Sequence, residues 1–345
     1  MDDQNLNNSS RRGFIKAATL GAVTMSVAAT GLLNNVQAAP KAPPKLKSYA
    51  HKQNFSVVTI GTGNPIPDAH RASACTMIQF NGKYYLLDTG NGANDSLALN
   101  GFVLGDINAI LYTHLHADHT TDFVDIMINR WMTGGKELQI MGPPRTGAYY
   151  NFMIDFFADD LTYRQYRGLE RGVTEVGMFS GVDITELKGE NNFQLDGMKV
   201  TTAALTHTMY NLGYRFDVDG KSIVVSGDTS FDPKLIELAK DADILIIDAN
   251  INVSTNNKGS DEKAFTDKAI VKPKPKYEYS GNFDVAPHMG IDEVAKTATE
   301  ANVKTVVLTH LSPAAFDINS VMPYFEKAGF KGQVVEALDG LEINP

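Results

Sequence analysis

The sequence feature that most constrains the fold is a run of six residues, His114-Leu115-His116-Ala117-Asp118-His119. The run follows an apolar stretch at 109–113 that predicts a β-strand, and apolar residues at helical spacing follow it over 120–131. Side chains two apart in an extended segment point to the same side, so His114 and His116 face one cavity. Asp118 and His119 lie at the turn into the helix, where the chain can fold them over that cavity. Because imidazole and carboxylate groups are zinc ligands, the run predicts a metal site at a strand end.

Three further candidate ligands follow other apolar stretches that predict strands. His207 comes after residues 198–205, Asp228 lies in a Gly-Asp turn after 222–226, and His310 comes directly after 305–309. Loops at strand ends are where a sheet framework exposes functional side chains. Each of these residues alone would be unremarkable in a loop, but together with the six-residue run they predict one shared site.

The order of predicted elements indicates the fold class. Short strands dominate the first part of the chain, and an Asn81-Gly82 turn joins two of them. Later, amphipathic helices at 233–240 and 291–302 each precede the next apolar strand. The predicted strands cover residues 55–60, 75–80, 84–88, 109–113, 198–205, 212–218, 222–226, 244–247 and 305–309. This pattern predicts an α/β (α+β) protein with two packed sheets and helices outside.

Residues 1–38 predict a targeting segment and not part of the fold. Ser10-Arg11-Arg12-Gly13-Phe14-Ile15-Lys16 resembles a twin-arginine export signal, and Val36-Gln37-Ala38 predicts cleavage before Ala39. The apolar run at 17–33 contains Gly, Thr and Ser, so we expect no stable membrane anchor. We therefore expect a periplasmic protein exported by the twin-arginine machinery, with a linker at 39–54 and one catalytic domain at 55–345.

Charge and cysteine content narrow the possible partners. The net charge is −9, and removing three basic and two acidic residues with the signal changes it to −10. A negative net charge argues against a broad basic surface that binds nucleic acid. We therefore expect a small-molecule ester substrate and no nucleic-acid partner. The single cysteine, Cys75, excludes an internal disulfide and a cysteine-rich metal site, and we expect it in the core.

The order of the candidate ligands resembles the metallo-β-lactamase superfamily over 55–345. The resemblance implies a four-layer αββα sandwich with two zinc ions per chain. It implies one zinc on His114, His116 and His207, a second on Asp118, His119 and His310, and a bridge through Asp228. Asp228 stands where true β-lactamases commonly have a cysteine ligand, which disfavours lactam hydrolysis.

Three segments are similar to the tRNase Z-like branch, which includes RNA-processing phosphodiesterases and exported arylsulfatases. They are Gly61-Thr62-Gly63-Asn64-Pro65-Ile66-Pro67, Arg71-Ala72-Ser73 and Asp284-Val285-Ala286-Pro287-His288-Met289-Gly290. The resemblance implies that His288 acts near the leaving group. The chain departs from the branch at Asp248-Ala249, where His-Glu is usual, and at Met289-Gly290, where small hydroxyl residues are usual. It also shows no Gly/Pro-rich arm of the kind that grips tRNA.

These features predict a hydrolase in which a metal-bridging hydroxide attacks, Asp118 orients it and His288 protonates the leaving oxygen. The first expected function is an exported arylsulfatase; the alternatives are a periplasmic phosphodiesterase of small diesters such as cyclic nucleotides, and then a lactonase. An iron oxidoreductase and a metal-free binding protein are further alternatives of a different class. Monomer and homodimer both stay open.

Two segments each allow two interpretations. Residues 252–281 are polar and rich in Lys and Pro, and they form either an insertion near the site or a solvated loop. Residues 155–171 carry Tyr163 and Tyr166 and form either a substrate wall or a surface helix.

Overall fold

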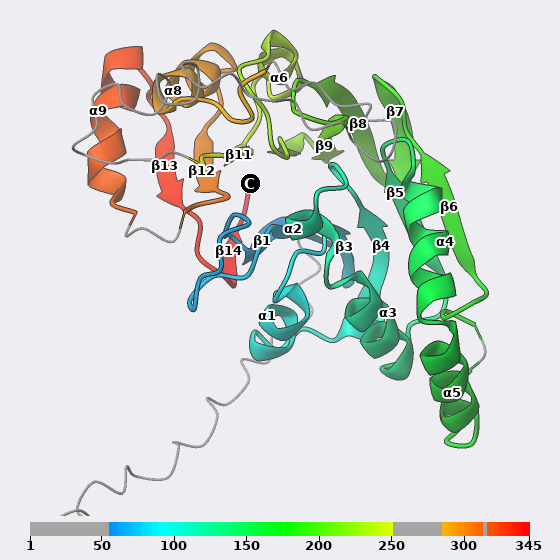
Figure 1. The fold of residues 1–345 in the computed structure, drawn as a ribbon. Helices are drawn as coiled ribbons and strands as arrows, with labels where there is room; N and C mark the ends of the chain where they lie inside the picture. The colour runs from blue at the N-terminus through cyan, green and yellow to red at the C-terminus, as the bar shows by residue number, and fades with distance from the viewer. Residues whose placement is uncertain (1–54, 175, 251–284, 313–315) are drawn as a thin grey trace, which may run out of the picture. The chain divides into compact units, whose positions relative to one another are not determined.

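The computed structural model describes residues 55–174, 176–250, 285–312 and 316–345. In this part of the chain, two seven-stranded sheets form the centre of the fold (Figure 1). The first sheet has the order β14 (Leu341–Ile343), β1 (Ser56–Gly61), β2 (Cys75–Phe80), β3 (Lys83–Leu87), β4 (Ile107–Leu111), β5 (Leu138–Gly142) and β6 (Val182–Glu186). The second has the order β13 (Gln333–Glu336), β12 (Thr305–Thr309), β11 (Ile244–Asp248), β10 (Lys221–Val225), β9 (Asn211–Val218), β8 (Met198–Leu205) and β7 (Asn191–Leu195).

Helices flank both sheets on their outer sides (Figure 1). The first sheet is accompanied by α1 (Ala93–Leu99), η1 (Leu104–Asp106), the one-turn α2 (Ala117–Thr120), α3 (Phe123–Met132), α4 (Thr146–Phe156) and α5 (Ala158–Leu169). The second sheet is covered by α6 (Pro233–Leu238), α8 (Ile291–Glu300) and α9 (Ile318–Ala328).

Three separate apolar layers explain why this arrangement forms. Successive residues of a strand point to opposite faces, so Val57 packs between the sheets while Val58 packs toward the helices of the first sheet. In the second sheet, Ile246 faces the layer between the sheets and Leu245 faces α6, α8 and α9. Since both faces of each sheet are buried, the predicted four-layer αββα sandwich is confirmed.

Strand direction brings the ends of several strands to one edge of the sandwich. In the first sheet β3, β4 and β5 run parallel, and in the second β10, β11 and β12 run parallel. Strand β8 pairs antiparallel with β9, which pairs antiparallel with β10, so β8 ends at the same edge as β10. The carboxyl ends of parallel strands are where open sheets expose functional side chains. Residues that follow β4, β8, β10 and β12 can therefore meet.

Most predicted strands match the structure closely, and the Asn81-Gly82 turn has the two positive φ angles, 51° and 72°, that this hairpin turn requires. The helix predicted over 120–131 is confirmed as α3, but it begins at Phe123 and not at Thr120. The chain forms α2 and α3, with a break at Thr121 and Asp122 between them. The Asp122 N–H donates to the Thr89 carbonyl at 2.9 Å and not to a carbonyl of the preceding turn, which interrupts the helix.

Several predictions fall on other parts of the chain. The export signal at 1–38, the linker at 39–54 and the segment 252–281 lie outside the described residues. Among the described residues, no helix has the length and hydropathy needed to cross a membrane. Cys75, the first residue of β2, is buried in the apolar layer between the first sheet and its helices, as predicted.

Candidate metal centre

The six-residue run supplies the part of the site that comes from the first sheet. His114 follows β4 after two residues, His116 is the residue before the first turn of α2, and Asp118 and His119 lie within α2. The short helix therefore reverses the chain just after the strand end. This reversal turns Asp118 and His119 back toward His114, as the sequence predicts.

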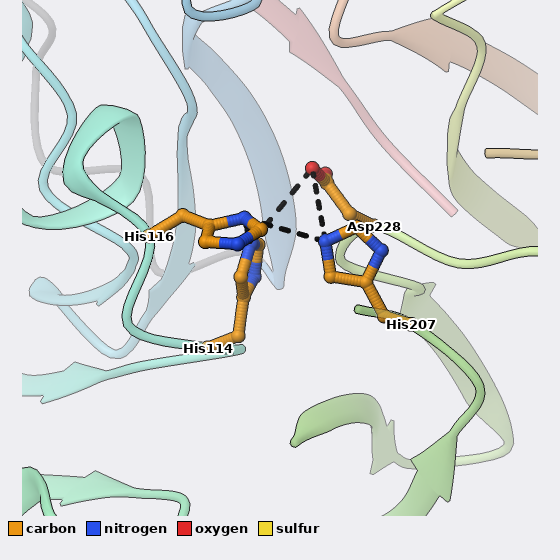
Figure 2. Close-up of side chains that lie close together, drawn as sticks. All are labelled: His114, His116, His207 and Asp228. Carbon is orange, nitrogen blue, oxygen red and sulfur yellow. Dashed lines mark hydrogen bonds and ion pairs between the residues drawn. The ribbon is translucent and has the colours of Figure 1, made fainter. Parts of the chain in front are cut away.

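The second sheet supplies the other candidate ligands, and the Asp228 carboxylate faces the imidazoles of His114, His116 and His207 (Figure 2). Four imidazole nitrogens surround Asp228 Oδ2: the Nε2 atoms of His119 and His310 at 3.4 Å, of His114 at 3.8 Å and of His207 at 4.0 Å. The structure thus brings together all seven residues that the sequence predicts as ligands. They are His114, His116, Asp118, His119, His207, Asp228 and His310.

The seven residues divide into two groups around Asp228. The three-histidine group consists of His114, His116 and His207, whose ligand atoms and that of Asp228 all lie within 4.8 Å of one another. The carboxylate-rich group consists of Asp118, His119 and His310, together with Asp248. Asp248, the last residue of β11, was not predicted as part of the site; the sequence marked it only as a departure from the tRNase Z-like branch.

Unusual backbone conformations aim two of these side chains. Gly227, just before Asp228, has a φ of 60°, and a Cβ there would lie 2.4 Å from the Asn211 side chain. Only glycine fits this position, which turns Asp228 away from β10 into the site. His310 itself has a φ of 60°, a conformation that is rare for a non-glycine residue and that recurs at functional sites.

Two histidines of the run, His114 and His119, have an outer partner that fixes which nitrogen faces the site. Thr113 Oγ1 donates to Asp88 at 2.7 Å and accepts from His114 Nδ1 at 3.0 Å. His119 Nδ1 donates to the same Asp88 carboxylate at 2.8 Å. The Nε2 atoms of both imidazoles therefore point inward, and a carboxylate behind a ligating histidine is a recurring arrangement in metal sites.

Of the two histidines from the second sheet, His207 is held by a hydrogen bond, and His310 lies beside a carboxylate. His207 Nδ1 donates to the Pro287 carbonyl at 2.8 Å, and His310 Nδ1 lies 3.4 Å from Asp248 Oδ1. Sequence reasoning missed Asp88 as well as Asp248. Both come at the ends of apolar strands, so the rule that identified Asp228 would have identified them too.

Burial and charge act differently on the two groups. Burial lowers the pKa of His114 well below its usual range and lowers that of His207 to about 4. Burial also opposes protonation of His119 and His310, but their neighbouring carboxylates outweigh it. Asp228 and Asp88 raise the pKa of His119, and Asp228, Asp118 and Asp248 raise that of His310 to about 10. The three-histidine group is therefore neutral near pH 7, whereas the carboxylate-rich group holds protons.

The donor set fits a metal ion. His119 Nε2 is buried and has no hydrogen-bond partner among the described residues, although it faces two carboxylates. Leaving such an atom unpaired is costly unless another group satisfies it. A cavity of about 30 Å³ lies beside it, lined in part by His119, Asp228, Asp248 and His310. Nitrogen and oxygen donors without sulfur are typical of a catalytic zinc site.

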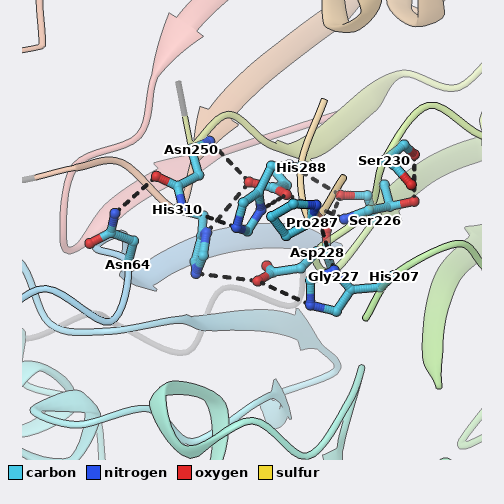
Figure 3. A network of polar contacts seen from close by, with 12 residues as sticks. Asn64, His207, Ser226, Gly227, Asp228, Ser230, Asn250, Pro287, His288 and His310 are labelled. Atoms are coloured by element: carbon cyan, nitrogen blue, oxygen red, sulfur yellow. Dashed lines mark hydrogen bonds and ion pairs between the residues drawn. The ribbon is translucent and has the colours of Figure 1, made fainter. Parts of the chain in front are cut away.

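His288 lies beside His310 of the carboxylate-rich group (Figure 3). Its Nδ1 donates to Asp248 Oδ2 at 2.6 Å, and its Nε2 lies 3.1 Å from the Asn250 amide nitrogen. Its ring is 5.3 Å from that of His310. Because Nδ1 donates to Asp248, Nε2 accepts the hydrogen bond from the Asn250 amide, and it is the nitrogen at which the ring can exchange a proton.

Comparison with known proteins agrees with this fold. The family described as Beta-lactamase superfamily domain matches residues 83–311. Ribonuclease Z from Mycobacterium marinum is 30% identical over 266 residues, which cover 75% of this chain and 87% of the relative. The YhfI protein of Bacillus subtilis, a metallo-β-lactamase fold protein, covers 84% of this chain and 99% of its own, with a TM-score of 0.60 and 18% identity. The short form of human tRNase Z has a TM-score of 0.57 at 20% identity and covers 84% of this chain and 98% of its own.

These relatives correct one prediction. The expectation of no nucleic-acid partner is wrong, because relatives at 30% identity carry the name of an RNA-cleaving enzyme. The net charge of −9 describes the whole chain, whereas a metal site can attract one phosphate group locally. With the family match covering most of the chain, the chain belongs to the metallo-β-lactamase superfamily, and it is a hydrolase of that superfamily.

Proposed function

We propose that the chain is a phosphodiesterase that works with two zinc ions, one on each side of Asp228. The observation that carries this proposal is the Asp228 carboxylate, which lies within 4.0 Å of imidazoles from both groups. A single carboxylate shared in this way suits a bridging ligand. His114, His116 and His207 would hold one ion, and Asp118, His119 and His310 would hold the other.

The comparisons support a phosphodiester as the bond that is cleaved, since the relatives named ribonuclease Z match 87% of their own length. This reverses the order expected from the sequence, in which an arylsulfatase came first. The natural diester would be either a small molecule or part of an RNA.

Bound zinc would lower the pKa of a water molecule toward neutrality and would stabilise negative charge on phosphate oxygens. Burial raises the pKa of Asp118, but the hydrogen bond from His310, together with the neighbouring His119, outweighs burial and holds this pKa below its usual value. Asp118 therefore stays ionised and can accept a proton of that water. His288 would take up a proton at Nε2 in place of the hydrogen bond from Asn250 and would then donate that proton to the leaving oxygen. The hydrogen bond from Nδ1 to Asp248 keeps the ring oriented while this proton leaves.

The test is a substrate panel on purified protein reconstituted with zinc: bis(4-nitrophenyl) phosphate, 4-nitrophenyl sulfate, an aryl lactone and a precursor tRNA. We expect hydrolysis of the phosphodiester, loss of activity after chelation and about two zinc ions per chain by elemental analysis. A zinc-replete protein that hydrolyses only the lactone, or one active with a single metal ion, would overturn the proposal.

A sulfate monoester is the second candidate, because it shares the single negative charge and the tetrahedral centre of a phosphodiester. The acidic mature chain and the export signal favour a small substrate of this kind. If 4-nitrophenyl sulfate is cleaved at least as fast as the diester, the sulfatase takes first place.

We also propose export through the twin-arginine pathway, supported by the Arg11-Arg12 pair and the apolar run that follows it. Replacing both residues (R11K together with R12K) should retain the protein in the cytoplasm. Unchanged fractionation of this variant would contradict the proposal.

A further inference from the structure

A cavity of about 350 Å³ lies next to the three-histidine group and is not used by the chemistry described above. It is lined by Leu115, Arg145, Ala148, Tyr149, Phe152 and Met209. Leu115 stands between His114 and His116 in the chain, and Met209 follows His207 by two residues. One wall of the cavity is therefore built from the same two loops that present the three-histidine group.

The other wall is one face of helix α4. Arg145, Ala148, Tyr149 and Phe152 recur at intervals of three and four residues, which places them in one stripe along the helix. The Tyr149 hydroxyl donates to the Thr120 carbonyl at 2.7 Å, so its ring is fixed against the first sheet's helices. Phe152 is 63% exposed, and its ring stacks on that of Phe156 at 6.0 Å. An aromatic side chain that is held in place but left in solvent suits stacking with a planar group.

Arg145 adds a positive charge at the start of the same stripe. The nearby Glu186 carboxylate accepts hydrogen bonds from the backbone N–H groups of Arg145 and Gly147, at 3.0 and 3.1 Å. Among the described residues, the Arg145 guanidinium itself makes no ion pair within 4.0 Å. It is available for an anionic group that lies beyond a ring stacked on Phe152.

We infer that this cavity binds a nucleotide unit of the substrate, with its base against Tyr149 and Phe152 and its next phosphate on Arg145. The inference rests on the proposed phosphodiesterase function and names its substrate class. The leaving oxygen must face His288, which lies beside the carboxylate-rich group. The substituent that stays on phosphorus then points away from His288, toward the three-histidine group and the cavity beside it. A nucleotide unit combines a planar base with a second phosphate, which matches an aromatic wall and the Arg145 guanidinium.

The test uses three diesters that share 4-nitrophenolate as the leaving group, so that chemistry at the metal side is constant. They are methyl 4-nitrophenyl phosphate, thymidine 5′-(4-nitrophenyl phosphate), and the same thymidine ester with an added 3′-phosphate. The zinc-loaded protein should prefer the thymidine ester over the methyl ester in kcat/KM by roughly 5- to 100-fold, the range expected for stacking of one base. The 3′-phosphate should add about two- to five-fold, a gain that shrinks as salt is added.

Variants separate the two parts of the cavity. Phe152→Ala should remove most of the preference for the thymidine ester while leaving methyl ester hydrolysis unchanged. Arg145→Gln should remove only the gain from the 3′-phosphate. The matched controls are Tyr163→Ala and Arg167→Gln, which should change neither preference. Tyr163 is an aromatic residue on α5 that is 62% exposed and lies outside the cavity, and Arg167 pairs with Glu170 on the same helix.

Two results would overturn the inference in distinguishable ways. Equal hydrolysis of all three esters, or equal loss in Phe152→Ala and Tyr163→Ala, removes the cavity's role and leaves the phosphodiesterase function intact. If the zinc-loaded protein cleaves none of the three, the phosphodiesterase proposal fails and the inference fails with it.

Discussion

The three-histidine group and the carboxylate-rich group face the same Asp228 carboxylate but carry different charges. Burial keeps His114 and His207 neutral, so the first group offers free imidazoles. In the second group, Asp88, Asp118 and Asp248 surround His119 and His310 and favour their protonated forms. A cation entering the first group meets neutral donors, whereas one entering the second must displace protons. We therefore expect the three-histidine group to bind zinc more tightly at low pH.

The largest expected effect is at the one residue that the two groups share. Asp228→Asn keeps the shape of the side chain but removes the charge that four imidazoles face. Activity should fall by several orders of magnitude, and elemental analysis should show fewer than two zinc ions per chain. Retention of both ions at full activity would mean that Asp228 does not join the groups.

His288 tests whether the carboxylate-rich side also carries the proton donor. His288→Ala should keep both metal ions and slow turnover by roughly 10²–10⁴-fold on esters with alkoxide leaving groups. Esters that release 4-nitrophenolate, which leaves without a proton, should be affected much less. His70→Ala, at an exposed histidine, is the control. Loss of a metal ion from His288→Ala would make this residue a ligand instead of a donor.

Asp88 tests how strongly the outer carboxylate supports the run of histidines. It accepts hydrogen bonds from Thr113 and from His119, so Asp88→Asn should weaken zinc affinity by about 10- to 100-fold. Titration with a competing chelator measures the change. The exposed turn variant Asp219→Asn should leave the affinity unaltered, and an Asp88→Asn protein with unaltered affinity would assign Asp88 to the fold alone.

The smallest expected effect is on the stability of the metal-free protein as the pH changes. The His310 pKa is raised to about 10 by its carboxylates despite burial, above its ordinary value near 6.5 in an unfolded chain. Its stabilising contribution is complete below about pH 6.5 and is lost as the pH rises through about 10. The His207 pKa is lowered to about 4 by burial, so its contribution is complete above about pH 6.5 and is lost toward pH 4.

Thermal unfolding in a chelator should therefore give a maximum Tm near pH 6.5, with a decline on both sides. His310→Gln should flatten the decline on the alkaline side and His207→Gln that on the acid side. Parallel curves for the wild type and both variants would contradict the charge difference between the two groups.

The sequence alone determined the elements with strong local signals. Three such signals are the His114–His119 run, the glycine before Asp228 and the Asn81-Gly82 turn. Each predicts a local conformation or a ligand cluster without any contact to a distant part of the chain. The order of the predicted elements, with strands first and strand–helix alternation later, was enough to predict two packed sheets. His207 and His310 could be selected by their place directly after apolar strands.

Only the tertiary structure decided the distances between these segments. The distance of 3.4 Å between Asp228 and His310 depends on the parallel pairing of β10, β11 and β12, which join segments far apart in the chain. The roles of Asp88 and Asp248 became visible only when their histidine partners were placed against them. The cavity beside Leu115 joins two loops to one face of α4, and no single stretch of sequence contains it. Local patterns encode which side chains leave a strand end, but long-range packing sets their distances, burial and protonation.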